Sequence, residues 1–194
     1  MIKNTYKKSI KPNRVIIFGS NGFVAKNLKK TLLNKKIKVK SFSKNHINLL
    51  KINSRKIISN NVKSYDQIVF IAAEAPVKNI KMYLNNLNML INFIKGIQNI
   101  NFEQLIYISS DAVYSDTKNN IKENFSTKPN SLHGQMHIMR ENILENLYSD
   151  KLCILRPTLI YGHDDPHNGY GPNKFIRYAK KNNDIDLFGF GEEM

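Results

Sequence analysis

Two glycines, Gly19 and Gly22, stand directly after a run of four apolar residues, 15–18. An apolar run of this kind indicates a strand buried on both faces. Gly19 permits a tight turn, and Gly22 has no side chain to keep a pyrophosphate from the free N–H groups of the next helix. We expect this turn to bind a dinucleotide through Gly19, Ser20, Asn21, Gly22, Phe23 and Val24. The same pattern also occurs as a plain tight connection, so it needs support from the rest of the chain.

A second candidate binding element is Ser43-Lys44, which follows an alternating stretch over 37–42. At this place a dinucleotide fold usually carries an acid that binds the free ribose hydroxyls and repels a 2′-phosphate. Serine and lysine would tolerate or attract that phosphate, which favours NADP over NAD. Lys44 could equally be one more surface lysine.

Two histidines, His133 and His137, lie four residues apart in a predicted helix over 131–148. This spacing places both imidazoles on one face of the helix. A free imidazole titrates near pH ~6.5, which suits proton transfer at neutral pH. Ser110 and Asp111 stand at the end of a predicted strand over 105–110 and are the other candidates for catalysis.

The elements that position these residues alternate between strand and helix. Further strands are expected over 37–42, 67–73 and 152–155, a short helix within 46–64, and a helix over 79–99. The first helix carries Leu28, Leu32 and Leu33, and the helix over 79–99 has an apolar stripe of Leu84, Leu87, Leu90, Ile91, Ile94 and Ile97. The alternation predicts an α/β fold, a doubly wound and mostly parallel sheet with helices on both faces.

Composition limits the other classes of function. The 194 residues suffice for one well-cored domain with a small appendage, and the formal charge is +15. Because 25 of the 30 basic residues are lysines, we interpret the charge as a compositional bias spread over a solvated surface. No nucleic-acid motif appears, and residues 1–13 form a basic, flexible tail that is neither a signal nor a membrane span. Neither nucleic acid nor a membrane is therefore expected as a partner.

Cys153 is the single cysteine and lies in the apolar run 152–155. This placement favours a buried core thiol over a nucleophile. One cysteine excludes an internal disulfide, which fits a cytoplasmic location.

From Ile108 to Tyr114 the chain begins to resemble the extended short-chain dehydrogenases/reductases. Within that group it is similar to the NAD(P)-dependent nucleotide-sugar epimerases, dehydratases and 4-keto reductases. The glycine turn with Ala25 is similar to their G-x-x-G-x-x-G/A motif. Other matches are Ala72-Ala73, Asn86, Asn92, Leu155-Arg156-Pro157, Ile160-Tyr161-Gly162, 171–176 and 186–191.

The resemblance covers roughly residues 14–194. It implies a Rossmann-type NAD(P)-binding domain over 14–160, with Ala72 and Ala73 also near the cofactor, and a partial substrate-binding region over 161–194. It further implies a homodimer formed through the helices near 79–99 and 131–148.

The resemblance also assigns roles at the site. Ser110 takes the place of the hydroxyl that binds the reacting sugar oxygen. Asp111 matches the first acid of the dehydratases, whereas Ala112 replaces their glutamate, which favours epimerisation or keto reduction over dehydration. The implied substrate contacts are Ser110, Tyr114, Arg156, Asn173, Phe175 and Phe188. Tyr114 could serve as an acid or only pack beside the site.

His133 and His137 replace the tyrosine and lysine of the family's Y-x-x-x-K. There the tyrosine exchanges a proton with the sugar, while the lysine lowers the tyrosine pKa and binds the nicotinamide ribose. Three interpretations stay open here. His133 transfers the proton and His137 binds the ribose; or the site binds a dinucleotide or a nucleotide sugar without turnover; or the pair binds a metal with His163 or His167. The missing glutamate of H-E-x-x-H argues against a metal, and the loop over 163–167 is expected to be solvated.

Members of the resembled family continue beyond the segment that ends here at Met194. We therefore expect a C-terminally truncated chain whose sugar pocket has only its first wall. An open cleft excludes water poorly, and hydride transfer needs a dry site. The alternative to an oxidoreductase is thus a non-catalytic dinucleotide-binding remnant or regulator.

Overall fold

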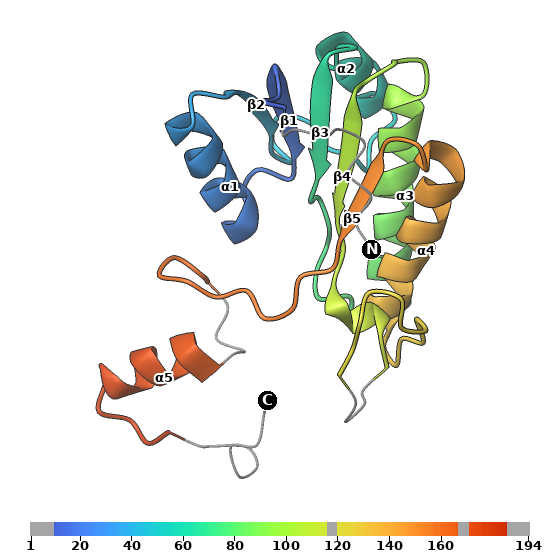
Figure 1. Ribbon diagram of the computed structural model, residues 1–194. Coiled ribbons are helices and arrows are strands. Elements are labelled where there is room, and N and C mark those ends of the chain that lie inside the picture. The colour runs from blue at the N-terminus through green and yellow to red at the C-terminus, as the bar shows by residue number, and fades with distance from the viewer. Residues whose placement is uncertain (1–9, 116–119, 167–170, 186–194) are drawn as a thin grey trace. The chain divides into compact units, whose positions relative to one another are not determined.

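The computed structural model describes residues 10–115, 120–166 and 171–185, and the chain divides into two compact units, 1–157 and 158–194 (Figure 1). The first unit contains a five-stranded parallel sheet in the order β2-β1-β3-β4-β5. Its strands are β1 (Arg14–Phe18), β2 (Lys38–Phe42), β3 (Asp66–Phe70), β4 (Gln104–Ile108) and β5 (Leu152–Leu155). Its helices are α1 (Phe23–Asn34), α2 (Ser54–Asn61), α3 (Ile80–Ile97) and α4 (Leu132–Tyr148), with a 3-10 turn η1 (Asp111–Val113). The second unit contains α5 (Gly171–Ala179).

The predicted α/β fold is confirmed, and its register decides where the site lies. Phe18 pairs with both Phe42 and Phe70, Phe70 pairs with Tyr107, and Ile108 pairs with Leu155. The carboxyl ends of all five strands therefore meet at one edge of the sheet. The glycine turn, the segment after β3 and the segment after β4 all leave the sheet there, where open α/β sheets bind ligands.

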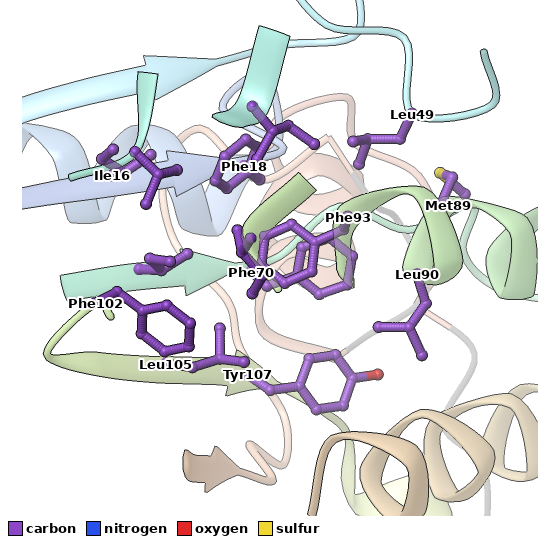
Figure 2. Packing of buried hydrophobic residues seen from close by; sticks show 14 of the residues in the cluster. Ile16, Phe18, Leu49, Phe70, Met89, Leu90, Phe93, Phe102, Leu105 and Tyr107 are labelled. Atoms are coloured by element: carbon purple, nitrogen blue, oxygen red, sulfur yellow. The ribbon is translucent and has the colours of Figure 1, made fainter. Parts of the chain in front are cut away.

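The larger core lies between the sheet and the helices α2, α3 and α4. Phe93 on α3 stacks on Phe70 with ring centroids 4.3 Å apart, and it meets Phe18 edge-on at 5.2 Å. Figure 2 shows these rings lying beside Leu90 and Tyr107 in the same layer. Such aromatic pairs add to the free energy gained from burying their surface.

The smaller core lies under α1 on the opposite face of the sheet. Ala25 is fully buried there against the strands, as expected for a small residue that lets a helix approach a sheet. Leu28 and Leu32 pack on the same cluster. Leu33 does not, because it points away from the sheet and keeps 50% of its surface exposed. The prediction that Leu33 shares the apolar face of α1 with Leu28 and Leu32 was therefore wrong.

The apolar stripe predicted for α3 was also partly wrong. Leu84 and Ile91 are 50% and 38% exposed. The helix is rotated because Asn86 faces the interior with Leu90 and Phe93, and its buried amide makes hydrogen bonds that apolar patterning does not reveal.

Two further details differ from the sequence-based expectation. β3 and β4 end at Phe70 and Ile108, before the small and hydroxyl residues that were assigned to them. Cys153 is only partly buried, because β5 is the outermost of the sheet's strands in the described part of the chain. No helix in the described ranges is long and apolar enough to span a membrane.

Replacing Phe93 by alanine should lower the free energy of unfolding by about 3–5 kcal/mol, because it empties the centre of the aromatic layer. Chemical denaturation followed by circular dichroism measures this loss. Leu84→Ala on the same helix is the control and should cost far less, because its side chain is half exposed. Equal losses for the two variants would contradict the described rotation of α3.

Candidate functional site

Gly19 is required by the fold itself. Its φ is +100°, and a Cβ at this position would lie 2.7 Å from the backbone nitrogen of Ala72. The N–H groups of Gly19 and Ser20 both donate to the carbonyl of Phe42, at 2.9 and 3.0 Å. The turn is thus held between the ends of β2 and β3, and any side chain at Gly19 would strain it.

Gly22 is different, because the protein around it leaves space. Its φ of −69° suits any residue, and a Cβ would meet only the carbonyl oxygen of Gly19 at 3.8 Å. Gly22 is the N-cap of α1, no side chain caps this helix end, and the first turn holds no acid. The open N–H groups and the helix dipole at this end therefore fit an anion such as a pyrophosphate.

A hollow of about 470 Å³ adjoins the glycine turn. It is lined by Ser20, Asn21, Lys26, Lys29, Lys30, Leu33, Ser41 and His46. The expected pair Ser43-Lys44 is arranged unequally: Lys44 is exposed, whereas Ser43 is buried with its hydroxyl 2.8 Å from Nδ1 of His46. His46 was missed in the sequence because nothing there shows that the chain turns back after β2.

The segment after β3 carries the two small residues expected near a cofactor. Ala72 is half-buried behind Gly19, and Ala73 is exposed. This placement is compatible with the close approach of a ligand to the backbone.

The start of α4 is fixed tightly against η1. The side chain of Ser131 caps the helix by accepting a hydrogen bond from the N–H of Gly134 at 3.1 Å. A Cβ at Gly134 would lie 1.9 Å from the carbonyl oxygen of Ala112. This contact brings His133 into the neighbourhood of Ser110 and Asp111, so the sequence-predicted catalytic residues do gather at one place.

His133 is half-buried, and its Nδ1 accepts a hydrogen bond from the N–H of Val77 at 3.4 Å. The proton of the neutral imidazole is then assigned to Nε2. Burial lowers the pKa of His133, and the nearby Asp111 carboxylate only partly opposes this effect. The neutral ring is therefore the dominant form near pH 7.

His137 is 5% exposed, and its Nδ1 lies 2.7 Å from the hydroxyl of Tyr107. Its ring stands edge-on to that of His133, with centroids 4.8 Å apart. Burial, then His133 and Arg140, lower the pKa of His137 to about 3, whereas burial raises the pKa of Tyr107 to about 12. His137 therefore holds a neutral side chain at the position where the sequence led us to expect a contact with the ribose.

Arg140 is a buried cation one turn further along α4. Its guanidinium donates to the carbonyl of Ala72 at 2.9 Å and to the carbonyl and side-chain oxygens of Asn86 at 2.7 and 2.9 Å. None of the ion pairs in the described part of the chain includes Arg140, and burial lowers its pKa. It joins α4 to α3 and to the segment behind Gly19, a role that the sequence did not indicate.

Glu141 links the end of β4 to the segment after β5. It accepts a hydrogen bond from the hydroxyl of Ser109 and forms a two-pronged ion pair with Arg156 at 2.7 and 3.1 Å. Arg156 also donates to the hydroxyl of Tyr114 at 2.7 Å, and the Glu141 carboxylate raises the pKa of this arginine. Arg156 and Tyr114, which we expected to contact substrate, are thus bonded to each other.

Ser110 and Asp111 remain accessible at the carboxyl edge of the sheet, after β4. The Ser110 hydroxyl accepts from the N–H of Ala112 at 3.1 Å and donates to the Asp111 carboxylate at 3.0 Å. Asp111 itself is exposed. Both side chains can therefore meet a ligand without rearrangement of the core.

In the second unit, the amide of Asn173 donates to the carbonyl of Gly162 at 3.0 Å and to the carboxylate of Asp165 at 2.8 Å. Phe175 is half-buried on α5. Phe188 and His167 lie outside the described residues. Within those ranges no group of three or more metal-ligating side chains is found.

The chain belongs to the NAD dependent epimerase/dehydratase family, whose model matches residues 15–194. The N-acetyl-alpha-D-glucosaminyl-diphospho-ditrans,octacis-undecaprenol 4-epimerase of Escherichia coli O157:H7 is 25% identical over 183 residues, which cover 87% of this chain and 55% of the relative. The chain thus spans about half of that protein.

Solved structures share the fold. The dTDP-4-dehydrorhamnose reductase of Bacillus anthracis, in complex with NADP, gives a TM-score of 0.72 at 24% identity, covering 88% of this chain and 60% of that one. The UDP-glucose 4-epimerase of Thermus thermophilus, in complex with NAD, gives 0.74 at 18% identity, covering 90% and 65%. The chain thus spans less than two thirds of the length of each of these two proteins.

The neutral state of His137 has a consequence for stability at low pH. Unfolded His137 takes up a proton below about pH 6.5, whereas the folded side chain does so only near pH 3, so the unfolded state binds more protons in between. Stability is therefore retained above pH ~6.5 and falls as the pH drops below it, by up to about 1.4 kcal/mol per pH unit from this group. In His137→Gln, urea denaturation at a series of pH values should show a shallower loss. His163→Gln, at an exposed histidine, is the control and should keep the wild-type slope. Equal slopes for wild type and His137→Gln would contradict the prediction.

Proposed function

We propose that this chain binds a nicotinamide dinucleotide at the carboxyl edge of the sheet and exchanges hydride with a carbon of a nucleotide-activated sugar. The observation that carries the proposal is the contrast between the two glycines. Gly19 is needed by the fold, whereas the space at Gly22 has no structural use and opens on the uncapped end of α1. A pyrophosphate occupies such a space in dinucleotide-binding folds.

In this proposal the turn over 19–24 holds the pyrophosphate, and the segment Ala72-Ala73 lies under the cofactor. The nicotinamide, when bound, supplies or accepts the hydride. Ser110 orients the reacting sugar oxygen, and residues 161–194, with Asn173 and Phe175, contribute to substrate binding. Epimerisation or keto reduction is favoured over dehydration because Ala112 provides no second acid.

The hydrogen bond at Nδ1 of His133 favours one chemical role for this ring over the other. Because Nδ1 accepts from the N–H of Val77, the neutral ring presents Nε2–H rather than a basic lone pair. We therefore propose that His133 donates a hydrogen bond that stabilises negative charge on the sugar oxygen. When the sugar hydroxyl is oxidised to a carbonyl, the exposed carboxylate of Asp111, beside Ser110, accepts the hydroxyl proton, and it returns a proton to the oxygen in the reverse reaction.

Cofactor preference also belongs to this proposal. Lys44 is exposed, and the lysines lining the hollow add cations beside the glycine turn. No acid lines this hollow. This arrangement supports NADP over NAD, since a 2′-phosphate gains from nearby cations.

A non-catalytic dinucleotide-binding protein is the second candidate. The observation that favours it is the neutral, buried His137 where related enzymes carry a lysine. Without that cation, a tyrosine-based proton transfer of the family type has no counterpart here. Cofactor binding without turnover would support this candidate.

The similar proteins suggest two kinds of carrier for the sugar, a nucleotide and a lipid diphosphate. The curated relative is named for a sugar on an undecaprenyl diphosphate, whereas the structural neighbours are named for nucleotide sugars. Both carriers present a diphosphate next to the sugar. We propose a diphosphate-linked sugar, with the nucleotide as the first carrier to test.

We also propose a homodimer through α3 and α4. Ile80, Leu84 and Ile91 on α3 and Leu147 on α4 are exposed apolar side chains. A monomeric mass in sedimentation at micromolar concentration would contradict this proposal. A cytoplasmic location, favoured by the single cysteine, stays a prediction.

Gly22→Ser should weaken cofactor binding without loss of stability. Serine is a good N-cap, its Cβ meets no close atom, and its side chain would occupy the space proposed for the pyrophosphate. Titration with NADPH and NADH, followed by nicotinamide fluorescence, should show at least about tenfold weaker binding. Gly19→Ala, in contrast, should lower the melting temperature, because its backbone is strained for alanine. Unchanged NADPH affinity in a folded Gly22→Ser variant would contradict the assignment of the glycine turn as the pyrophosphate-binding site.

Two substitutions of His133 separate hydrogen bonding from proton transfer. With UDP-glucose as the substrate tested, His133→Phe should lower kcat by about 100-fold or more, because no donor faces the sugar oxygen. His133→Gln keeps an N–H donor and should retain kcat within about tenfold. Asp111→Asn should be as damaging as His133→Phe. If His133→Gln is as inactive as His133→Phe, His133 is the proton-transfer group and the proposed role is wrong.

A further inference from the structure

Positive charge is concentrated in one third of the chain. Residues 1–65 contain 17 of the 30 basic residues and none of the 15 acidic ones, whereas residues 66–194 contain 13 basic and 15 acidic residues. A compositional bias would have placed about a third of the acids in the first segment. The expectation of evenly spread lysines is therefore wrong.

The fold places a group of these basic residues at one edge of the sheet. α1 and β2 lie at the end of the strand order farthest from β5, and α1 covers the face opposite to α2, α3 and α4 (Figure 1). Six exposed lysines follow one another from α1 to the start of β2 and form what we call the basic face: Lys26, Lys29, Lys30, Lys35, Lys36 and Lys38.

The first acid of the chain does not offset these lysines. Asp66 is fully buried, and Arg14 holds its carboxylate with two hydrogen bonds of 2.7 Å. The N–H of Lys63 donates to it as well, at 2.6 Å. Its charge is thus neutralised inside the sheet and does not reach the basic face.

The chemistry of the basic face favours a lipid surface over a nucleic acid. Leu33 is half exposed between the lysines of α1 and those that follow it. No aromatic residue occurs from Lys26 to Lys38, whereas binding to single strands relies on stacking of bases on aromatic rings. Lysines flanking an exposed leucine on a helix are typical of segments that lie on anionic membranes.

We propose that the basic face docks this chain on the surface of a bilayer that contains anionic phospholipid. Each lysine held near such a surface adds a similar increment of attraction. The inference depends on where the charges lie and not on cofactor binding. It would bring the proposed diphosphate-sugar site close to lipid-linked carriers.

Vesicle flotation tests the proposal with the whole chain. The chain should float with vesicles of phosphatidylcholine and phosphatidylglycerol and stay behind with phosphatidylcholine alone. Binding should disappear at ~1 M NaCl, where the screening length is about 3 Å. Equal binding to both kinds of vesicle, or binding that survives this salt, would overturn the proposal.

Charge reversal locates the surface. The triple variant Lys35→Glu, Lys36→Glu, Lys38→Glu avoids the lysines that line the hollow and should weaken vesicle binding on the order of 100-fold. The matched control Lys81→Glu, Lys95→Glu, Lys122→Glu changes the net charge equally at exposed positions outside the basic face and should weaken it no more than about threefold. If the first triple variant misfolds, the same positions changed to Gln should still weaken binding. Equal effects of the two triple variants would overturn the proposal.

Two parallel measurements separate the remaining outcomes. NADPH titration of the Lys35, Lys36 and Lys38 variant should give the wild-type affinity, so a failure of the membrane proposal is distinguishable from a failure of the cofactor proposal. A DNA duplex added at equal charge should leave the chain on the vesicles. If the duplex removes it and binds more tightly, the basic face belongs to a nucleic-acid partner and the proposal is wrong.

Discussion

The close contact between Gly19 and Ala72 is the constraint on which the carboxyl edge of the sheet depends. A backbone at φ +100° lets β1 turn into α1 directly against the segment that leaves β3. Arg140 holds that segment from the other side through the carbonyl of Ala72. The turn, the segment and α4 therefore form one rigid assembly, and the open end of α1 takes its position from it. This rigidity is what a binding site for a large, charged cofactor requires.

Arg140 also contributes to the neutral state of His137, after burial and the neighbouring His133. No carboxylate within the described ranges pairs with this buried guanidinium, which places one positive charge in a region of low dielectric. A lysine at position 137 would add a second cation beside it, at a large electrostatic cost. A histidine can lose its proton instead and bind the hydroxyl of Tyr107. The cation at 140 and the neutral ring at 137 are thus physically consistent.

The sequence was sufficient for the order of elements and the glycine turn because these follow from local patterns. Apolar runs and helix caps such as Ser131 act within a few residues. The sequence was insufficient for the partners of polar side chains, which come from distant elements. Tyr107 with His137 is a pairing between a strand and a helix, and Arg140 with Asn86 is a pairing between two helices. Apolar patterning also misplaced Leu33 and Leu84, because it cannot show that a neighbouring buried amide or small residue turns the helix.

The distribution of charge divides the molecule into two electrostatic regions. On α4, Arg140 is buried and bonded to carbonyls, Glu141 is paired with Arg156, and His137 has lost its proton. Around α1 and β2, charges are exposed and of one sign. Buried groups of the first kind fix geometry, because each has lost its water and needs its protein partner. Exposed lysines of the second kind contribute little to the fold, since solvent screens them. Their concentration at one edge is therefore better explained by an anionic ligand or surface than by stability.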